Sequence, residues 1–254
     1  MKRLLLPVCA LLFAVSAFAQ TADEIIEKHI KAMGGMEKIK AVQTVKATGT
    51  MKMGPMEVPI TLTKARPESV RMDFTVQGMT GSQAYDGTIG WAVMPFMGKK
   101  EPERMSDDML KDIKEEADFD GSLIDSKAKG NTVEYLGKVE VEGSPAYKLK
   151  VTTKYGNESI DYLDADSYLV IKTEGKRKIQ GQEMETESVI GDYKEVNGVM
   201  YPHSMQSHRK GAPEGQGQSI TVEKYEINAK VDNAVFKMPE VKKEEPKAEA
   251  KKEQ

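Results

Sequence analysis

Cysteine is almost absent from this chain of 254 residues, which contains only Cys9. A single cysteine excludes an intrachain disulfide, and its place near the N-terminus excludes a thiolate nucleophile or thiolate metal ligand in the rest of the sequence. Stability must therefore come from an ordinary hydrophobic core. Aromatic residues are also scarce, at 6% of the chain, so that core depends on aliphatic side chains and methionine.

An excess of positive charge is absent as well. The sequence has 37 Lys and Arg residues against 40 Asp and Glu residues, which gives a formal net charge of −3. Acidic and basic residues are interspersed along the chain, so no strongly charged stripe is visible. Because binding to a nucleic acid depends largely on a basic surface, this balance excludes a nucleic acid as the partner.

Only one long apolar run is present, and it lies at the N-terminus. Two basic residues precede the apolar residues 4–18, and alanines flank Phe18 on both sides. This pattern is typical of a secretory signal peptide and predicts a signal at 1–19 with cleavage after Ala19. An uncleaved anchor is the alternative. Cys9 is not a lipidation site, because no small residue stands directly before it.

The opposite end of the chain is polar and charged. Residues 241–254 (VKKEEPKAEAKKEQ) have almost no apolar side chains. Such a segment cannot bury enough apolar surface to offset the entropy of ordering, which predicts a disordered tail. Residues 20–240 are long enough for one sizeable core. We therefore expect a signal at 1–19, one domain at 20–240 and a tail at 241–254.

Two segments have the period of a helix. In the first, Thr21 has capping-box spacing to Glu24, and paired glycines end an apolar stripe of Ile25, Ile26, Ile30 and Met33. His29 lies beside that stripe and is interpreted as a structural histidine. In the second, residues 105–119 (MSDDMLKDIKEEADF) predict an amphipathic helix that begins at Ser106 and covers a sheet.

In most of the remaining chain, apolar and polar residues alternate. This period of two is typical of strands with one apolar face and one solvent-exposed face. Three such runs lie between residues 45 and 76, and seven more follow residue 132. Short turns with Gly, Asn or Asp connect them, and Asn197-Gly198 is a strong hairpin signal. These patterns predict an α+β fold with an antiparallel meander of roughly a dozen strands and two or three helices.

No catalytic motif is present in the sequence. It contains no G-x-S-x-G, no phosphate-binding loop and no H-E-x-x-H. His203 and His208 are five residues apart on a predicted strand, so their side chains face opposite sides and do not chelate one metal together. We therefore expect that the protein is not an enzyme and that it has no metal site and no cofactor.

Methionine is the apolar residue that stands out. The sequence has 16 methionines against six phenylalanines, and eleven of the methionines lie in residues 33–109. Methionine suits a cavity wall that accepts variable apolar partners, although an ordinary core also uses it. Met51, Met53 and Met56 lie close enough to be thioether ligands of Cu(I). No His or Cys accompanies them, and a hairpin turn at 54–55 would set Met56 almost opposite Met53, which favours one wall of a pliable apolar groove.

Three segments carry a resemblance to a known family. Residues 64–74 (KARPESVRMDF) hold Arg66-Pro67 between two strands. Residues 84–96 (AYDGTIGWAVMPF) hold an Asp-Gly turn, a tryptophan and a Pro-Phe pair, and residues 231–239 (VDNAVFKMP) follow near the end. In this order, behind a signal peptide and a short helix, they resemble the LolA-type periplasmic carriers of outer-membrane lipoproteins. The resemblance covers the domain in order and departs from the family pattern at 99–131 and in the tail.

This resemblance implies an architecture and a site. It implies a single-domain, unclosed antiparallel β-barrel of about eleven strands, with helices over its concave apolar face and acyl chains in the cavity between them. It also implies that an arginine, Arg66, holds the helical lid and couples it to ligand entry and release. The residues expected in the cavity and lid are Met51, Met53, Val58, Ile60, Met72, Phe74, Trp91, Phe96, Met109 and Ile113.

The expected function is therefore that of a periplasmic carrier or binder of lipoprotein or lipid acyl chains. A buried methylene gains about 0.8 kcal/mol, so a chain that crosses an aqueous compartment needs a shielding cavity. We expect a monomer, and the implied partners are an inner-membrane release complex and an outer-membrane acceptor. The alternatives are an envelope sensor or assembly module with the same fold, and a methionine-based Cu(I)-binding protein.

Overall fold

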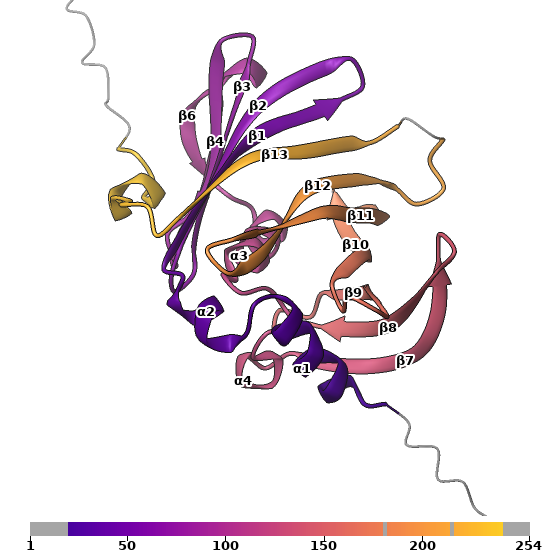
Figure 1. Ribbon diagram of the computed structural model, residues 1–254. Coiled ribbons are helices and arrows are strands. Elements are labelled where there is room, and N and C mark those ends of the chain that lie inside the picture. Colours follow the sequence, from indigo (N-terminus) through magenta and orange to yellow (C-terminus); the bar gives the residue numbers. More distant parts are fainter. Residues whose placement is uncertain (1–19, 180–181, 214–215, 241–254) are drawn as a thin grey trace, which may run out of the picture.

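A computed structural model describes residues 20–179, 182–213 and 216–240 of the protein. The predicted signal at 1–19 and the predicted tail at 241–254 lie outside the described residues. Within them, one antiparallel sheet of 13 strands curves around a set of helices (Figure 1). The α+β class and the unclosed barrel expected from the sequence are confirmed, with more strands than the resemblance implied.

The first half of the sheet is a meander in which each strand pairs with the next one in the chain. Its register sets Met53 opposite Met56 across the turn at 54–55, as the sequence predicts, and Met51 opposite Val58. The six strands are β1 (Thr44–Met53), β2 (Met56–Ala65), β3 (Ser69–Val76), β4 (Met79–Tyr85), β5 (Gly90–Met94) and β6 (Lys99–Arg104), with a 3-10 turn η1 (Pro95–Met97) before the last.

The second half is also a meander, and it joins the first where its last strand pairs with β1. The sheet therefore runs without a break from β6 to β7, and these two edge strands are consecutive in the chain. The strands of this half are β7 (Thr132–Val141), β8 (Ser144–Thr152), β9 (Glu158–Asp164), β10 (Val170–Ile179), β11 (Gln182–Val196), β12 (Val199–Arg209) and β13 (Gln218–Ile227), followed by a 3-10 turn η2 (Asn233–Phe236).

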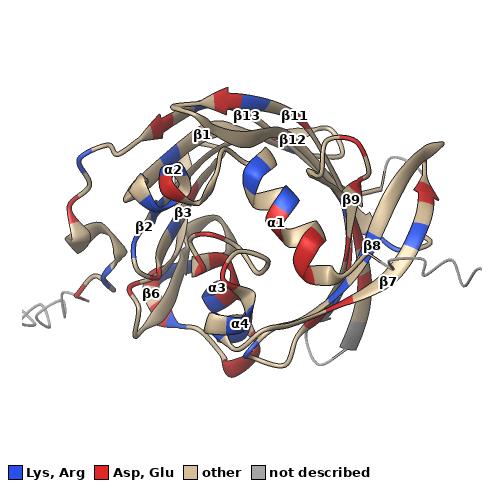
Figure 2. Cartoon of the chain, turned by 60° about the horizontal axis from the view of Figure 1, so that its bottom comes forward, with Lys and Arg blue, Asp and Glu red and all other residues tan. Residues whose placement is uncertain are grey.

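Helices occupy the inside of the curved sheet (Figure 2). Within the described residues they are α1 (Ala22–Ala32), α2 (Met36–Ala41), α3 (Asp107–Ala117) and α4 (Ser126–Lys129). Thr21 and Glu24 form the predicted capping box of α1, and the Ser106 side chain caps α3 as predicted. The segment that carries α3 and α4 links β6 to β7 and so crosses the open side of the sheet.

Each of the longer helices packs its apolar stripe on a different part of the concave face. Ile25 and Ile26 of α1 lie against Leu149 and Leu163 of β8 and β9. Ile113 of α3 lies against β3 and β4 in a separate cluster, and Ile39 of α2 belongs to a third. Burying one such side chain stabilises the fold by about 1.5–3 kcal/mol, so each cluster fixes one helix in place.

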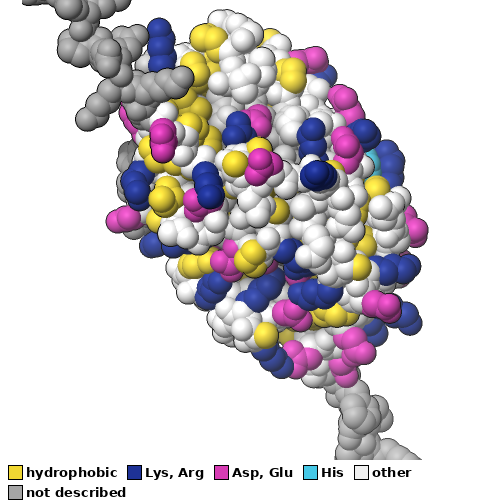
Figure 3. All heavy atoms as spheres, turned by 90° about the vertical axis from the view of Figure 1, so that its left-hand side faces the viewer, with side chains coloured by type: hydrophobic (Ala, Val, Ile, Leu, Met, Phe, Trp, Pro, Cys, Tyr) yellow, Lys and Arg dark blue, Asp and Glu magenta, His cyan; other side chains and the backbone are white. Residues whose placement is uncertain are grey.

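The outer surface is mixed in character. On the face in Figure 3, charged side chains of both signs are spread out, and hydrophobic side chains lie in patches between them. His29 is buried, and its Nδ1 lies 2.8 Å from the carbonyl oxygen of Tyr168, which fits the predicted structural role. None of the helices that the structure describes is long and apolar enough to span a membrane.

The join between the two halves depends on a glycine. Gly49 lies where β1 shifts its register against β13, and a Cβ at this position would lie 2.0 Å from the carbonyl oxygen of Thr221. We expect Gly49→Ala to lower the free energy of unfolding by about 2 kcal/mol, because β13 must move away. Gly175→Ala on β10 is the matched control, since its nearest neighbour would be 3.9 Å away. Urea denaturation checks both variants, and equal stability of the two would contradict the packing argument.

Candidate functional site

An apolar groove of about 420 Å³ lies on the concave face of the first half of the sheet. Its floor consists of alternate residues of β1, β2 and β3, and one side of α3 forms its wall. The period of two along each strand puts these residues on one face, and the register aligns them across the strands. Eight of the residues expected from the sequence line this groove: Met51, Met53, Val58, Met72, Phe74, Phe96, Met109 and Ile113.

One end of the groove is filled by an aromatic pair. The rings of Phe74 and Phe96 meet edge to face with their centroids 5.7 Å apart. Both rings lie over Gly81, where a Cβ would come within 2.7 Å of Phe96 and 2.8 Å of Phe74. The absence of a side chain at Gly81 therefore lets the two rings reach the sheet.

The other two expected residues lie elsewhere. Ile60 is on the same face as the groove, opposite Phe74, but it is only 7% exposed and does not line the groove. Trp91 pairs with Ala84, which in turn pairs with Arg71, and this register puts Trp91 on the opposite face of the sheet. There its Nε1 donates to the carbonyl oxygen of Phe236 at 2.8 Å. The expectation that Trp91 lies at the cavity is thus corrected, because the pairing of β3, β4 and β5 turns the indole away from it.

Apolar contacts hold the helix α3 in its place over the groove. Its Leu110 comes so close to Gly90 of β5 that a Cβ there would lie 2.9 Å from the leucine side chain. Ile113 is buried against the sheet, whereas Met109 remains 43% exposed at the mouth of the groove. The wall of the groove is therefore a helix that is buried on one side and open to solvent at its first turn.

Arg66 follows β2 directly and connects three elements. Its Nε donates to the carbonyl oxygen of Val42 at 2.7 Å, and its Nη2 donates to that of Ile39 at 3.0 Å, which ties it to the end of α2. The same guanidinium binds both carboxylate oxygens of Asp120, at 2.9 and 2.5 Å. Its carbon also lies 4.4 Å from the centre of the Phe119 ring. Arg66 thus joins the β2–β3 turn, α2 and the loop that directly follows α3.

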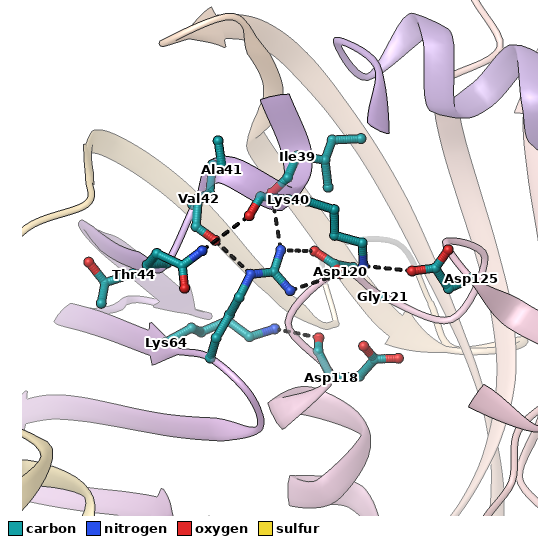
Figure 4. Close-up of polar contacts among 12 residues, drawn as sticks. Ile39, Lys40, Ala41, Val42, Thr44, Lys64, Asp118, Asp120, Gly121 and Asp125 are labelled. Carbon is teal, nitrogen blue, oxygen red and sulfur yellow. Dashed lines mark hydrogen bonds and ion pairs between the residues drawn. The ribbon is translucent and has the colours of Figure 1, made fainter. Parts of the chain in front are cut away.

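Asp120 is the centre of this cluster (Figure 4). Its side chain is 3% exposed, and Lys40 pairs with it while also reaching Asp125 at 2.6 Å. Burial alone would raise the pKa of Asp120, but hydrogen bonds from Arg66 and Lys40 outweigh it and hold the pKa below its usual value. We call Arg66, Asp120, Lys40 and Asp125 the Arg66 cluster. No pattern in the sequence pointed to Asp120, which lies 54 residues from Arg66.

A second hollow, of about 460 Å³, has a polar wall. It lies against the concave face of β9, β10 and β11, where Ser159, Asp161 and Thr173 replace apolar side chains. We call it the polar cavity. Sequence reasoning assigned these strands but no site to them. The sequence pattern that points to this cavity is that β10 and β11 carry polar residues on both of their faces.

Asp161 is the buried carboxylate of the polar cavity. It is 6% exposed, and the Ser159 hydroxyl donates to it at 3.3 Å. Burial raises the pKa of Asp161 to about 6, although hydrogen bonds from Thr173 and Ser159 act in the opposite direction. In the part of the chain that the structure describes, no group of three His, Cys, Asp or Glu residues is placed to hold a metal ion.

Comparisons with known proteins bear on the fold. No protein-family model matches the chain, and no curated protein matches it in sequence. A LolA superfamily protein from Nitrosomonas europaea is similar in structure with a TM-score of 0.58 and 14% identity, over 86% of this chain and 98% of that one. An outer membrane lipoprotein-sorting protein domain from Vibrio parahaemolyticus has a TM-score of 0.55 and 14% identity, over 85% and 97% of the two chains.

A third solved structure has the same architecture. A DUF1329 family protein from Desulfovibrio piger has a TM-score of 0.51 and 12% identity, over 86% of this chain and 98% of that one. Each of the three structural matches covers at least 85% of this chain and at least 97% of the other chain. The proteins therefore share the whole architecture and not just one part of it. The LolA-like fold that the sequence motifs indicated is therefore confirmed.

The Arg66 cluster makes a testable contribution to stability. Arg66→Met leaves the buried Asp120 carboxylate with Lys40 alone, so we expect the free energy of unfolding to fall by about 3 kcal/mol. Arg104→Met is the matched control, because Arg104 is exposed on β6. Urea denaturation at neutral pH measures both, and a loss for Arg66→Met as small as that of the control would contradict the role of the cluster.

The pH dependence of the same variants follows from the pKa of Asp120. Because that pKa is lowered on folding, the cluster stabilises the fold above the unfolded value of about 4 and loses this contribution as the pH falls through the folded value. The stability difference between wild type and Arg66→Met should therefore shrink in acid.

Asp161 should have the opposite effect on stability. Since its folded pKa is raised, its ionisation costs stability as the pH rises from about 4 to about 6, and the cost persists above that range. We expect Asp161→Asn to be more stable than wild type by about 3 kcal/mol at mildly alkaline pH and equally stable near pH 4. Asp166→Asn, at an exposed turn position, is the charge-matched control and should change little. Thermal melts at both pH values measure the difference, and a destabilised Asp161→Asn at alkaline pH would contradict the argument.

Proposed function

We propose that this protein is a periplasmic carrier or binder of the acyl chains of lipoproteins or lipids. The observation that carries the proposal is the apolar groove, with its methionine and aromatic lining and the helix α3 over it. The likeness of the fold to a LolA superfamily protein and to a lipoprotein-sorting domain supports the same class of ligand.

The size and chemistry of the groove suit a flexible hydrocarbon chain. Its volume of about 420 Å³ lies in the range of small-molecule sites, which is about 300–1,000 Å³. Each buried methylene gains about 0.8 kcal/mol, so a chain of about ten methylenes gains about 8 kcal/mol before the costs of binding. Unbranched methionine side chains adapt to chains of different length and branching more easily than a rigid aromatic wall does.

Entry and release require that α3 move, and its contacts allow this. The helix packs on β3 and β4 through Leu110 and Ile113, and its Glu116 pairs with Lys64 at 4.0 Å. Its Glu115 also accepts a hydrogen bond from the Thr153 hydroxyl at 2.6 Å. An acyl chain can replace the apolar contacts, whereas the bond to Thr153 must break or follow the helix as it opens. The Arg66 cluster fixes the loop directly after α3, so we propose that this loop is the hinge about which the helix opens.

The cellular setting follows from the same proposal. A signal at 1–19 would direct the chain into the periplasm, where an exposed acyl chain needs shielding from water. A carrier of this kind takes its cargo from an inner-membrane release complex and passes it to an outer-membrane acceptor. The proposal requires no catalytic step, since binding and release alone move the cargo.

A fluorescent fatty-acid methyl ester, which has no charged head group, tests the groove. We expect the wild-type protein to bind it, and Met72→Glu in the groove floor to bind at least about tenfold more weakly, because an acyl chain would leave the new carboxylate without a partner. Met97→Glu is the matched control, since Met97 is 70% exposed in η1 and should leave the affinity unchanged. Titration of fluorescence against protein concentration gives the three affinities.

A second variant separates lost binding from lost folding. Met109→Glu also lines the groove, but Met109 is 43% exposed and lies in the first turn of α3, where an acidic residue is favourable. It should fold normally and still weaken binding. If the wild-type protein does not bind the methyl ester, or if both groove variants bind it as tightly as Met97→Glu, the proposed function is wrong.

A further inference from the structure

The concave face of the sheet is divided between two chemistries. Its first half carries the apolar groove, and its second half carries the hydroxyl and carboxylate groups of the polar cavity. The register lines these groups up across three strands: Asp161 of β9 is opposite Thr173 of β10, which is opposite Ser188 of β11. The polar wall is thus a continuous patch and not a set of scattered side chains.

The two hollows meet along α3. Asp112 and Glu116 of this helix line both the apolar groove and the polar cavity. The groove and the polar cavity are therefore adjacent at this side of α3. A site with an apolar part and a polar part next to each other fits an amphiphile, with its chain in the first and its head group in the second.

The charges of the polar cavity define the head group. Seven carboxylates and three lysines are among the described residues that line it. All three lysines pair with carboxylates: Lys129 with Asp118 at 2.5 Å, Lys154 with Glu68 at 3.1 Å and Lys176 with Glu185 at 3.7 Å. The cavity is therefore acidic, and an anionic head group would meet repulsion there while a cationic one would be attracted.

Asp161 gives this acidic cavity a buried anchoring point. In the described structure its partners are the hydroxyls of Ser159 and Thr173, neither of which carries a compensating charge. A buried carboxylate without a cation is costly, and an ammonium group that binds it offsets that cost. The raised pKa of Asp161 has the same physical origin.

We propose that the ligand is an amphiphile with a cationic amine as its polar end. Its apolar chain occupies the groove, and Asp161 is the buried counter-ion of its amine in the polar cavity. This inference rests on the proposed function, because it assigns the second half of the same ligand. It adds a selectivity that the groove alone does not provide, since hydrocarbon walls do not distinguish one head group from another.

Three amphiphiles with the same dodecyl chain test this selectivity. Dodecylammonium, dodecyl maltoside and dodecyl sulfate are cationic, neutral and anionic, and each is used below the concentration at which it forms micelles. Isothermal titration calorimetry with the whole protein gives their affinities. We expect wild type to bind the cation about tenfold more tightly than the neutral compound, and the anion most weakly.

Asp161→Asn supplies the decisive comparison. It should remove the preference for the cation, so that the cationic amphiphile binds no more tightly than dodecyl maltoside. Asp166→Asn, with the same change in net charge at an exposed turn, should keep the preference, which separates a specific counter-ion from the overall charge of the protein. A thermal melt of each variant confirms that it is folded.

The outcomes separate the two proposals. If all three amphiphiles bind alike, or if the anion binds most tightly, the head-group inference is overturned while acyl-chain binding stands. If Asp161→Asn keeps the full preference for the cation, the assignment of Asp161 is overturned. If none of the amphiphiles binds, the proposed function fails together with the inference.

Discussion

The open edge of the sheet is the constraint on which the rest of the structure depends. The edge strands β6 and β7 lie at opposite ends of the strand order, so the concave face is not closed by strand pairing. The chain between these two strands carries α3 and α4 across the opening, and α1 and α2 enter from the N-terminal side. Helices cover a curved sheet less completely than a second sheet would, because their apolar stripes are narrow. The hollows that remain beside α3 are a consequence of this geometry.

The Arg66 cluster anchors the helices that cover the concave face. Apolar contacts are not directional, so they do not by themselves fix the position of a helix on the sheet. Arg66 fixes the end of α2 through two carbonyl oxygens and the loop after α3 through Asp120. The anchoring is polar and directional, whereas the packing of α3 on the sheet is apolar and adaptable. The loop after α3 is therefore anchored by charged groups, while α3 itself contacts the sheet largely through apolar side chains.

The division of the concave face explains why the two hollows differ. Strands β1 to β3 present Met51, Val58 and Met72 inward, and the outward residues of β1 are threonines and lysines. Strands β9 to β11 present Ser159, Asp161 and Thr173 inward instead. Burying these three polar side chains inside a sealed core would be unfavourable. It is tolerated here because the unclosed barrel leaves the inner face of these strands beside an open cavity and not inside a packed core.

Local patterns in the sequence were sufficient for the elements and for much of the groove. The capped helices, the period-two strands and the hairpin that sets Met53 opposite Met56 depend on neighbouring residues, and the groove floor follows from strand parity. Trp91, Asp120 and Asp161 could not be placed in this way. Strand pairing turned Trp91 to the other face, and chain folding brought Asp120 to Arg66 from 54 residues away. Asp161 has the alternation of an ordinary strand residue, and only the curvature of the sheet decided that its side faces a buried cavity. Periodicity determines which side chains share a face, whereas the surroundings of that face are decided by contacts between distant parts of the chain.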